Sequence, residues 1–253
     1  MQIGAQFYTV RNQCQTLDDF ALTLKKVADI GYKTVQISGT CPYEAQWLRE
    51  QLDKNGLQCV LTHIPVPRLV GETAQVIADH HVFGCENIGL GWYAFNEEKE
   101  EESYAHFMNT FPKVAQDIRA GGQYFMYHNH AQEFKRAPGS GSQIILEKLT
   151  QEIPADVMGF TLDTFWVQAG GGVPAQGVKN LAGRVPVIHL KDYAYGRKMA
   201  VVGEGNINFD RVFTAAETAG AKYMLVEQDD CNGEDPIECL RRSYEYLKAC
   251  GFN

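Results

Sequence analysis

The feature that most constrains this chain is a local pattern that recurs along it. Six times, an amphipathic helical stretch ends at a glycine, and a short run rich in β-branched and aromatic residues follows within a few positions. Glycine readily adopts the left-handed conformation that ends a helix, so each occurrence predicts a helix followed by a strand. Two further β-rich runs complete the set of predicted strands, at residues 3–7, 34–38, 58–63, 87–90, 124–128, 157–162, 185–190 and 223–227.

Eight strand-helix units predict a barrel. The length of 253 residues gives about 32 residues per unit, close to the ~30 of one βα unit, and the total is near the ~250 of a complete (β/α)8 barrel. A doubly wound open sheet is the alternative, but it usually carries a glycine-rich turn after its first strand, and residues 4–9 contain none. No linker or low-complexity segment divides the chain. We therefore expect an α/β protein with a TIM-barrel fold, forming one domain over residues 1–253.

Charge and hydropathy exclude several classes of partner. The chain has 31 acidic and 23 basic residues, a formal net charge of −8, and no basic run that would contact phosphates, so nucleic acid is disfavoured. No stretch approaches the ~18 apolar residues of a membrane span, and the first residues lack the pattern of a signal peptide. The seven cysteines are odd in number and form no Cys-x-x-Cys pair, which favours free thiols. We expect a cytoplasmic protein, monomeric or homo-oligomeric, that binds neither nucleic acid nor membrane.

Polar residues gather where the predicted strands end. In a parallel barrel the carboxyl ends of all strands meet at one mouth. Five predicted strand ends carry ionisable groups after an apolar run: His63, His128 with His130 and Glu133, Asp163, His189 with Lys191, and Glu227. Neighbouring carboxylates repel one another unless a cation or proton neutralises them, and histidine, aspartate and glutamate are ligands of divalent metals. The sequence thus predicts a divalent metal ion in the mouth, with a metal-free polar mouth as the alternative.

Five segments together carry a resemblance to a known family: residues 127–134, 162–166, 187–192, 203–209 and 225–229. In order and spacing they resemble the sugar phosphate isomerase/epimerase family of the xylose isomerase-like TIM barrel superfamily, which also includes inosose dehydratases and endonuclease IV. The resemblance spans the whole chain. It implies a xylose isomerase-like barrel that acts on a small sugar or polyol.

The resemblance also implies a metal site. Members typically hold one divalent ion (Mn, Zn, Co or Mg) through a glutamate after strand five and three further residues, which correspond here to Asp163, His189 and Glu227. Relatives often have Glu-Asn-His where this chain has His-Asn-His at 128–130. The fifth-strand ligand is therefore either Glu133 or His128. We favour Glu133, because a carboxylate keeps the hard character of the usual ligand set.

A metal ion that binds a carbonyl and the adjacent hydroxyl lowers the pKa of the intervening C–H and stabilises an enediolate. By resemblance, Glu133 and Glu227 are the acid and base, and His128 or His130 can serve as proton shuttles instead. The residues predicted to contact substrate are His63, His130, Trp166 and Lys191. Lys191 either stabilises an oxyanion or pairs with Asp192. Trp166 stands where related epimerases often have histidine, which weakens an assignment to the ketohexose 3-epimerases.

These observations favour a metal-dependent isomerase or epimerase of a keto sugar or polyol. A lyase or dehydratase of an inosose or 3-keto sugar on the same scaffold is the main alternative. An endonuclease IV-like enzyme is less favoured, since it needs a three-metal cluster and a basic face, and a barrel that only binds sugar would not need the ligand set.

Overall fold

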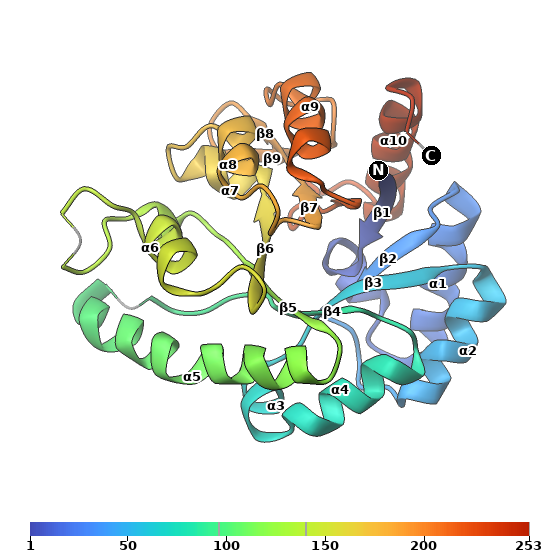
Figure 1. The fold of residues 1–253 in the computed structure, drawn as a ribbon. Helices are drawn as coiled ribbons and strands as arrows, with labels where there is room; N and C mark the ends of the chain where they lie inside the picture. Colours follow the sequence, from blue (N-terminus) through green and yellow to red (C-terminus); the bar gives the residue numbers. More distant parts are fainter. Residues whose placement is uncertain (96, 140, 253) are drawn as a thin grey trace.

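A closed barrel of eight parallel strands forms the centre of the protein (Figure 1). The computed structural model describes residues 1–95, 97–139 and 141–252. The barrel strands are β1 (Gln2–Gln6), β2 (Thr34–Ile37), β3 (Gln58–His63), β4 (Asn87–Leu90), β5 (Tyr124–His128), β6 (Met158–Asp163), β7 (Val187–Leu190) and β10 (Tyr223–Val226). Each pairs with the next along the chain, and β10 closes the barrel against β1. The predicted fold class and all eight predicted strands are confirmed, with ends that shift by one or two residues.

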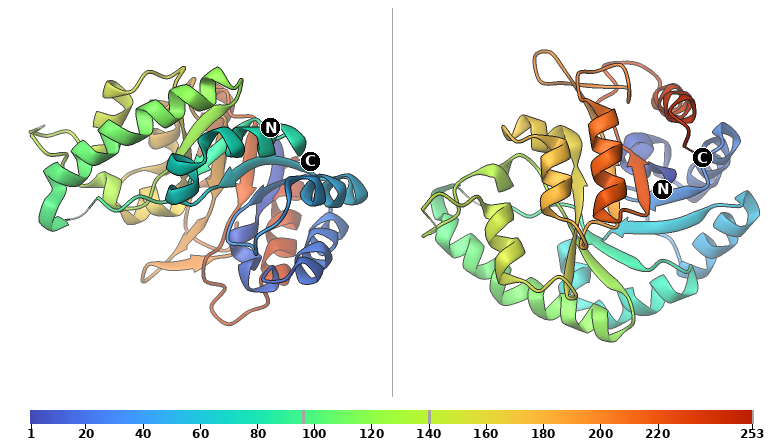
Figure 2. Two further views of the ribbon diagram at one scale, coloured as in Figure 1. Left: turned by 90° about the horizontal axis from the view of Figure 1, so that it is seen from below. Right: turned by 45° about the horizontal axis from the view of Figure 1, so that its top comes forward.

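Helices surround the barrel on its outer side (Figures 1 and 2). They are α1 (Leu17–Ile30), α2 (Ala45–Asn55), α3 (Val66–Gly71), α4 (Thr73–Val82), α5 (Glu100–Ala120), α6 (Ile145–Glu152), α7 (Thr164–Ala169), α8 (Pro174–Asn180), α9 (Phe209–Ala219) and α10 (Pro236–Ala249), with 3-10 turns η1 (Phe7–Gln13), η2 (Glu97–Lys99) and η3 (Gln132–Phe134). Strands β2, β4 and β7 are buried at every position, as expected for parallel strands covered by helices. Gly56 and Gly220 end α2 and α9 in the left-handed conformation that the sequence pattern predicted.

Inside the barrel, a small apolar cluster lies below the mouth. It contains Met126, Val187 and Leu225, from β5, β7 and β10. Side chains alternate along a strand, so the residue two positions later points to the same side. Two positions after these residues come His128, His189 and Glu227. The period of the strands thus places these three side chains one layer above the apolar cluster, toward the carboxyl ends.

A hairpin follows the seventh barrel strand. It consists of β8 (Asp192–Ala194) and β9 (Lys198–Ala200), which are antiparallel. The carboxylate of Asp192 accepts hydrogen bonds from the backbone N–H groups of Gly203, Gly205 and Ile207, at 2.9–3.2 Å. Asp192 therefore organises the loop after the hairpin. It is not the partner of Lys191, which the sequence offered as one possibility.

The seven cysteines are free thiols. Within the described ranges, no helix is both long enough and apolar enough to cross a membrane.

Candidate functional site

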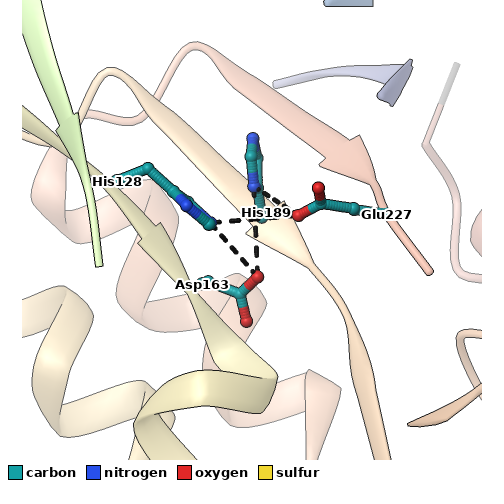
Figure 3. A group of neighbouring side chains, drawn as sticks. All are labelled: His128, Asp163, His189 and Glu227. Carbon is teal, nitrogen blue, oxygen red and sulfur yellow. Dashed lines mark hydrogen bonds and ion pairs between the residues drawn. The ribbon is translucent and has the colours of Figure 1, made fainter. Parts of the chain in front are cut away.

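Four buried side chains from four neighbouring strands converge at the barrel mouth (Figure 3). His128 ends β5, Asp163 ends β6, His189 lies in β7 and Glu227 directly follows β10. Each offers one nitrogen or oxygen atom, and these four atoms all lie within 4.8 Å of one another. Strand register explains part of this proximity, because Asp163 and His189 are direct partners across β6 and β7.

The two histidines have their outer nitrogens fixed by carbonyl oxygens. Nδ1 of His128 lies 2.9 Å from the backbone oxygen of Gly91, and Nε2 of His189 lies 2.6 Å from Oε1 of Gln36. A carbonyl oxygen only accepts hydrogen bonds, so these outer nitrogens carry the protons. The inner nitrogens therefore direct lone pairs toward the centre of the group. Residue 91 must be a glycine, because a Cβ at this position would lie 2.6 Å from Nδ1 of the neighbouring His63.

The two carboxylates are fixed in the same way. Oδ1 of Asp163 accepts a hydrogen bond from the backbone N–H of Trp166 at 2.9 Å, which caps α7, and Oε1 of Glu227 accepts one from Nε2 of Gln6 at 2.8 Å. Their other oxygens face the histidines: Oδ2 of Asp163 lies 3.3 Å from Nε2 of His128. All four side chains thus use an outer atom for anchoring and turn an inner atom to a shared centre.

The contact between His189 and Glu227 is the shortest in the group. Nδ1 of His189 lies 2.8 Å from Oε2 of Glu227, yet it makes no hydrogen bond of acceptable geometry. A nitrogen and an oxygen that both present lone pairs repel each other at this distance unless a cation or a proton lies between or beside them. The arrangement therefore fits a bound cation.

Lys191 is a positive charge already present beside the group. Its Nζ lies 3.4 Å from Oδ2 of Asp163, 3.3 Å from Oε2 of Glu227 and 2.7 Å from Oδ2 of Asp229. Three carboxylates and one ammonium leave a formal charge of −2 on these four residues when all are ionised. A divalent cation would balance that charge, so the charge count and the lone-pair geometry agree.

The pKa values of the group reflect this crowding. Burial would raise the pKa of Glu227, but the charge of Lys191 and the contact with His189 hold it well below its ordinary range. Burial would lower the pKa of His128, but its hydrogen bond to Asp163 and the charge of Glu227 raise it. The neighbouring carboxylates thus outweigh the effect of burial on this imidazole.

A cavity of about 680 Å³ opens onto this group. Among the residues that line it are His128, Lys191, Glu227 and Asp229. Oδ1 of Asp229 is buried and has no hydrogen-bond partner among the described residues. Burial and the nearby charge of Glu227 raise the pKa of Asp229 to about 6.

Glu133, which the sequence analysis favoured as the fifth-strand ligand, lies outside the group. Its Oε1 accepts a hydrogen bond from the hydroxyl of Tyr127 at 2.5 Å, and its Oε2 accepts one from the backbone N–H of His130 at 2.7 Å. Gln132 donates a third at 3.1 Å. The carboxylate is fully buried and its hydrogen bonds hold the loop after β5. The fifth-strand residue whose nitrogen lies in the group is His128.

The residues predicted to contact substrate occupy different positions. His63, His130 and Lys191 line the cavity, whereas Trp166 is not among the lining residues. Trp166 packs against His130, with ring centroids 5.0 Å apart. Within the part of the chain that the structure describes, the indole N–H of Trp166, Nε2 of His63 and Nδ1 of His130 are buried and have no hydrogen-bond partner. Burial lowers the pKa of His130 to about 3, so this imidazole is neutral at pH 7.

Sequence reasoning did not single out Gln6 and Gln36. Both are fully buried amides on the first two strands, and they anchor Glu227 and His189. A signal was present, because a glutamine inside the otherwise apolar end of a buried strand needs a polar partner.

Comparisons with known proteins agree with this fold. The family model for xylose isomerase-like TIM barrels matches residues 24–250. A sugar phosphate isomerase/epimerase from Parabacteroides distasonis ATCC 8503 is similar in structure, with a TM-score of 0.84 and 22% identity over 98% of this chain and 93% of that one. No functionally curated protein matches the chain in sequence.

More distant solved structures span different activities. A D-psicose 3-epimerase from Clostridium cellulolyticum H10, solved with D-tagatose, has a TM-score of 0.75 and 13% identity over 100% of both chains. A probable 3-DHS dehydratase of petrobactin synthesis from Bacillus anthracis has a TM-score of 0.72 and 13% identity over 98% of this chain and 99% of that one. At these identities the similarity establishes the fold only.

Proposed function

The chain belongs to the family of xylose isomerase-like TIM barrels, and from that premise we propose that it is a divalent-metal-dependent isomerase or epimerase of a small keto sugar or polyol. One observation carries the proposal. His128, Asp163, His189 and Glu227 each have an outer atom anchored by a hydrogen bond and an inner atom turned to one centre. Such outer-atom anchoring is typical of metal ligands.

The proposed ligand set has two imidazole nitrogens and two carboxylate oxygens. Imidazole suits zinc, iron, cobalt and related ions, whereas magnesium prefers oxygen ligands, so we expect manganese, zinc or cobalt to bind more tightly than magnesium. When bound, the ion would polarise a carbonyl and an adjacent hydroxyl of the substrate and lower the pKa of the C–H between them.

The chain's own residues supply the remaining chemistry. Proton transfer falls to ionisable groups that line the cavity, Glu227, Asp229 and His130. Lys191 keeps a buried positive charge beside the position where negative charge would develop. Glu133 is removed from the proposed acid-base pair, because its oxygens already accept three hydrogen bonds and it holds the β5 loop.

The proposed substrate is an unphosphorylated sugar or polyol. Lys191 is the single cationic side chain among the described residues that line the cavity, and it is engaged by three carboxylates. A phosphate group would therefore meet net negative charge. The chain's overall charge of −8 likewise argues against a nucleic-acid substrate.

Metal content tests the proposal. We expect one divalent ion per chain in the wild-type protein by elemental mass spectrometry after incubation with manganese, zinc or cobalt. His128→Ala should lose the ion, whereas Glu133→Gln should keep it. Asp156→Asn is a control, because this exposed carboxylate lies just before β6, at the opposite end from Asp163. Loss of the ion in Glu133→Gln but not in His128→Ala would restore the ligand set expected from sequence, and absence of metal in the wild type would end the proposal.

A lyase or dehydratase is the second candidate, because the group contains a single glutamate. The carboxylate of Glu133 hydrogen-bonds to Tyr127 and is not part of the group that contains Glu227, which favours a mechanism with one glutamate over the two-glutamate pair expected from sequence. Elimination needs one base and a proton donor for the leaving hydroxyl, which these residues can provide. Incubation with ketohexoses, ketopentoses and inososes in D₂O separates the two activities. Deuterium next to the carbonyl without loss of water identifies an isomerase or epimerase, and loss of water identifies a lyase.

A further inference from the structure

The cavity at the barrel mouth has two chemically different ends. Its polar end contains the groups described above. Its other lining residues include Tyr8, Pro65, Val66, Pro67, Leu90 and Trp92. The whole cavity measures about 680 Å³, within the range of about 300–1,000 Å³ found for sites that take drug-sized ligands. It is therefore larger than a single sugar ring requires.

The apolar end is built by the early strands. Tyr8 lies in η1 after β1, residues 64–65 connect β3 to α3, Val66 and Pro67 begin α3, and Trp92 follows β4. The Trp92 side chain is 55% exposed and Tyr8 is 37% exposed. An indole exposed inside a cavity rather than buried in the core marks a binding surface.

Tyr8 is held in place from one side. The guanidinium carbon of Arg11 lies 4.2 Å from the centre of the Tyr8 ring, and Nη1 of Arg11 donates to the backbone oxygen of Tyr8 at 2.7 Å. Nη2 of Arg11 also donates to the backbone oxygen of Asp229 at 3.1 Å. Arg11 thus ties the aromatic ring of the apolar end to the loop of the polar end, so the two ends are fixed relative to each other.

We propose that the substrate has two parts: a sugar or polyol ring that reacts at the polar end, and a second, uncharged ring that lies on Tyr8, Trp92 and the prolines of the apolar end. This inference rests on the proposed function for the identity of the first ring. The second ring is either an aryl group or another sugar, since both present an apolar face to aromatic side chains. It is uncharged because the described lining residues offer it no unengaged cation.

Unreactive glycosides test the second ring separately from the reaction. Matched methyl and phenyl β-glycosides of glucose, galactose and xylose, together with methyl β-cellobioside, have a blocked anomeric carbon and therefore lack the carbonyl needed for turnover. Binding is measured by calorimetry and ligand-observed NMR on the purified protein. We expect at least one phenyl glycoside or the disaccharide to bind about tenfold more tightly than its methyl counterpart.

Substitutions assign the difference to the apolar end. Trp92→Ala and Tyr8→Ala should abolish the tenfold preference, and Trp92→Phe should keep most of it, because a ring remains. Tyr195→Ala is the matched control, an aromatic residue that is 93% exposed and does not line the cavity. Circular dichroism confirms that each variant is folded.

Equal binding of methyl and larger glycosides, or no binding of any, would overturn the inference. So would a preference that survives in both alanine variants. These outcomes are independent of the metal and D₂O experiments. If the protein binds metal and exchanges protons but does not prefer the larger glycosides, the proposed function stands and the second-ring subsite is wrong. If it prefers the larger glycosides but neither binds metal nor exchanges protons, the subsite stands and the proposed reaction is wrong.

Discussion

The two halves of the barrel mouth differ in charge. The late half, formed by β5, β6, β7 and β10, carries the charged residues Asp163, Lys191, Glu227 and Asp229. The early half, formed by β1 to β4, contributes neutral amides and apolar surface: Gln6, Gln36, Leu90 and Trp92. The late half therefore contributes the ionisable groups of the candidate site, and the early half orients them and shapes the cavity.

Two buried histidines, one in each half, differ in the same way. His80 of α4 packs behind β3 in the early half, where its Nδ1 donates to the backbone oxygen of Val76 and its Nε2 accepts from Thr62. Burial lowers its pKa to about 4. His128, in the late half, is just as buried, but Asp163 and Glu227 raise its pKa. The neighbouring charges, rather than burial, distinguish the two sites.

The largest expected effect comes from removing a carboxylate of the late half. Asp163→Ala and Asp163→Asn should both lose the bound metal entirely, and His189→Ala should do the same, because each removes an inner ligand atom. The asparagine variant can still cap α7, so the alanine variant should be less stable than it by about 1 kcal/mol. Elemental mass spectrometry and denaturant unfolding measure the two effects. Full metal content in either Asp163 variant would contradict the division of the mouth.

Removing the buried ammonium should be the largest change in stability. Lys191→Met leaves Asp163, Glu227 and Asp229 without their shared cation, and breaking a buried ion pair in this way typically costs about 3–5 kcal/mol. We expect this loss in metal-free protein and a partial recovery when a divalent ion is added. Lys198→Met, on the exposed side of the hairpin, serves as the control. Unchanged unfolding free energy in metal-free Lys191→Met would show that the carboxylates are already protonated.

In the early half, His80 should contribute to the dependence of stability on pH between 6.5 and 4. The unfolded chain protonates His80 below its ordinary pKa of 6.5, but the folded protein does so only near 4. The unfolded state therefore binds more protons in this interval, and the free energy of unfolding falls as the pH drops from 6.5 to 4, by about 3 kcal/mol. His80→Gln should remove this part of the slope. Parallel urea titrations of the two proteins across that range test it, and identical slopes would refute it.

The smallest expected effect is a loss of metal affinity when an early-half residue no longer orients a late-half ligand. Gln36→Met removes the acceptor that fixes the outer nitrogen of His189 but leaves every inner atom in place. Loss of such an anchoring partner typically weakens metal binding by about 10–100-fold. Competition with a chelator measures the affinity. Gln58→Met, at the exposed start of β3, is the control. If Gln36→Met bound metal as tightly as the wild type, the early half would have no part in orienting the ligands.

Local signals in the sequence were sufficient to predict the barrel and to place the site at the carboxyl ends of its strands. Glycine caps, helical periodicity and short apolar runs are local signals, and they located every strand of the barrel. Because parallel strands end at one mouth, the positions of Asp163, His189 and Glu227 at strand ends were sufficient to predict that they lie together.

Tertiary structure alone decided which groups complete the site. Glu133 follows β5 by five residues, and the path of the intervening loop turns its carboxylate to Tyr127 and the backbone of His130 rather than to the centre. Lys191 likewise reaches across to Asp229 rather than to its neighbour Asp192. Side chains within a strand are directed by its fixed alternation, whereas side chains beyond the strand end follow hydrogen bonds to residues distant in sequence. The alternation of side chains along β5 therefore sets the direction of His128, whereas the direction of Glu133 depends on the fold of the loop after the strand.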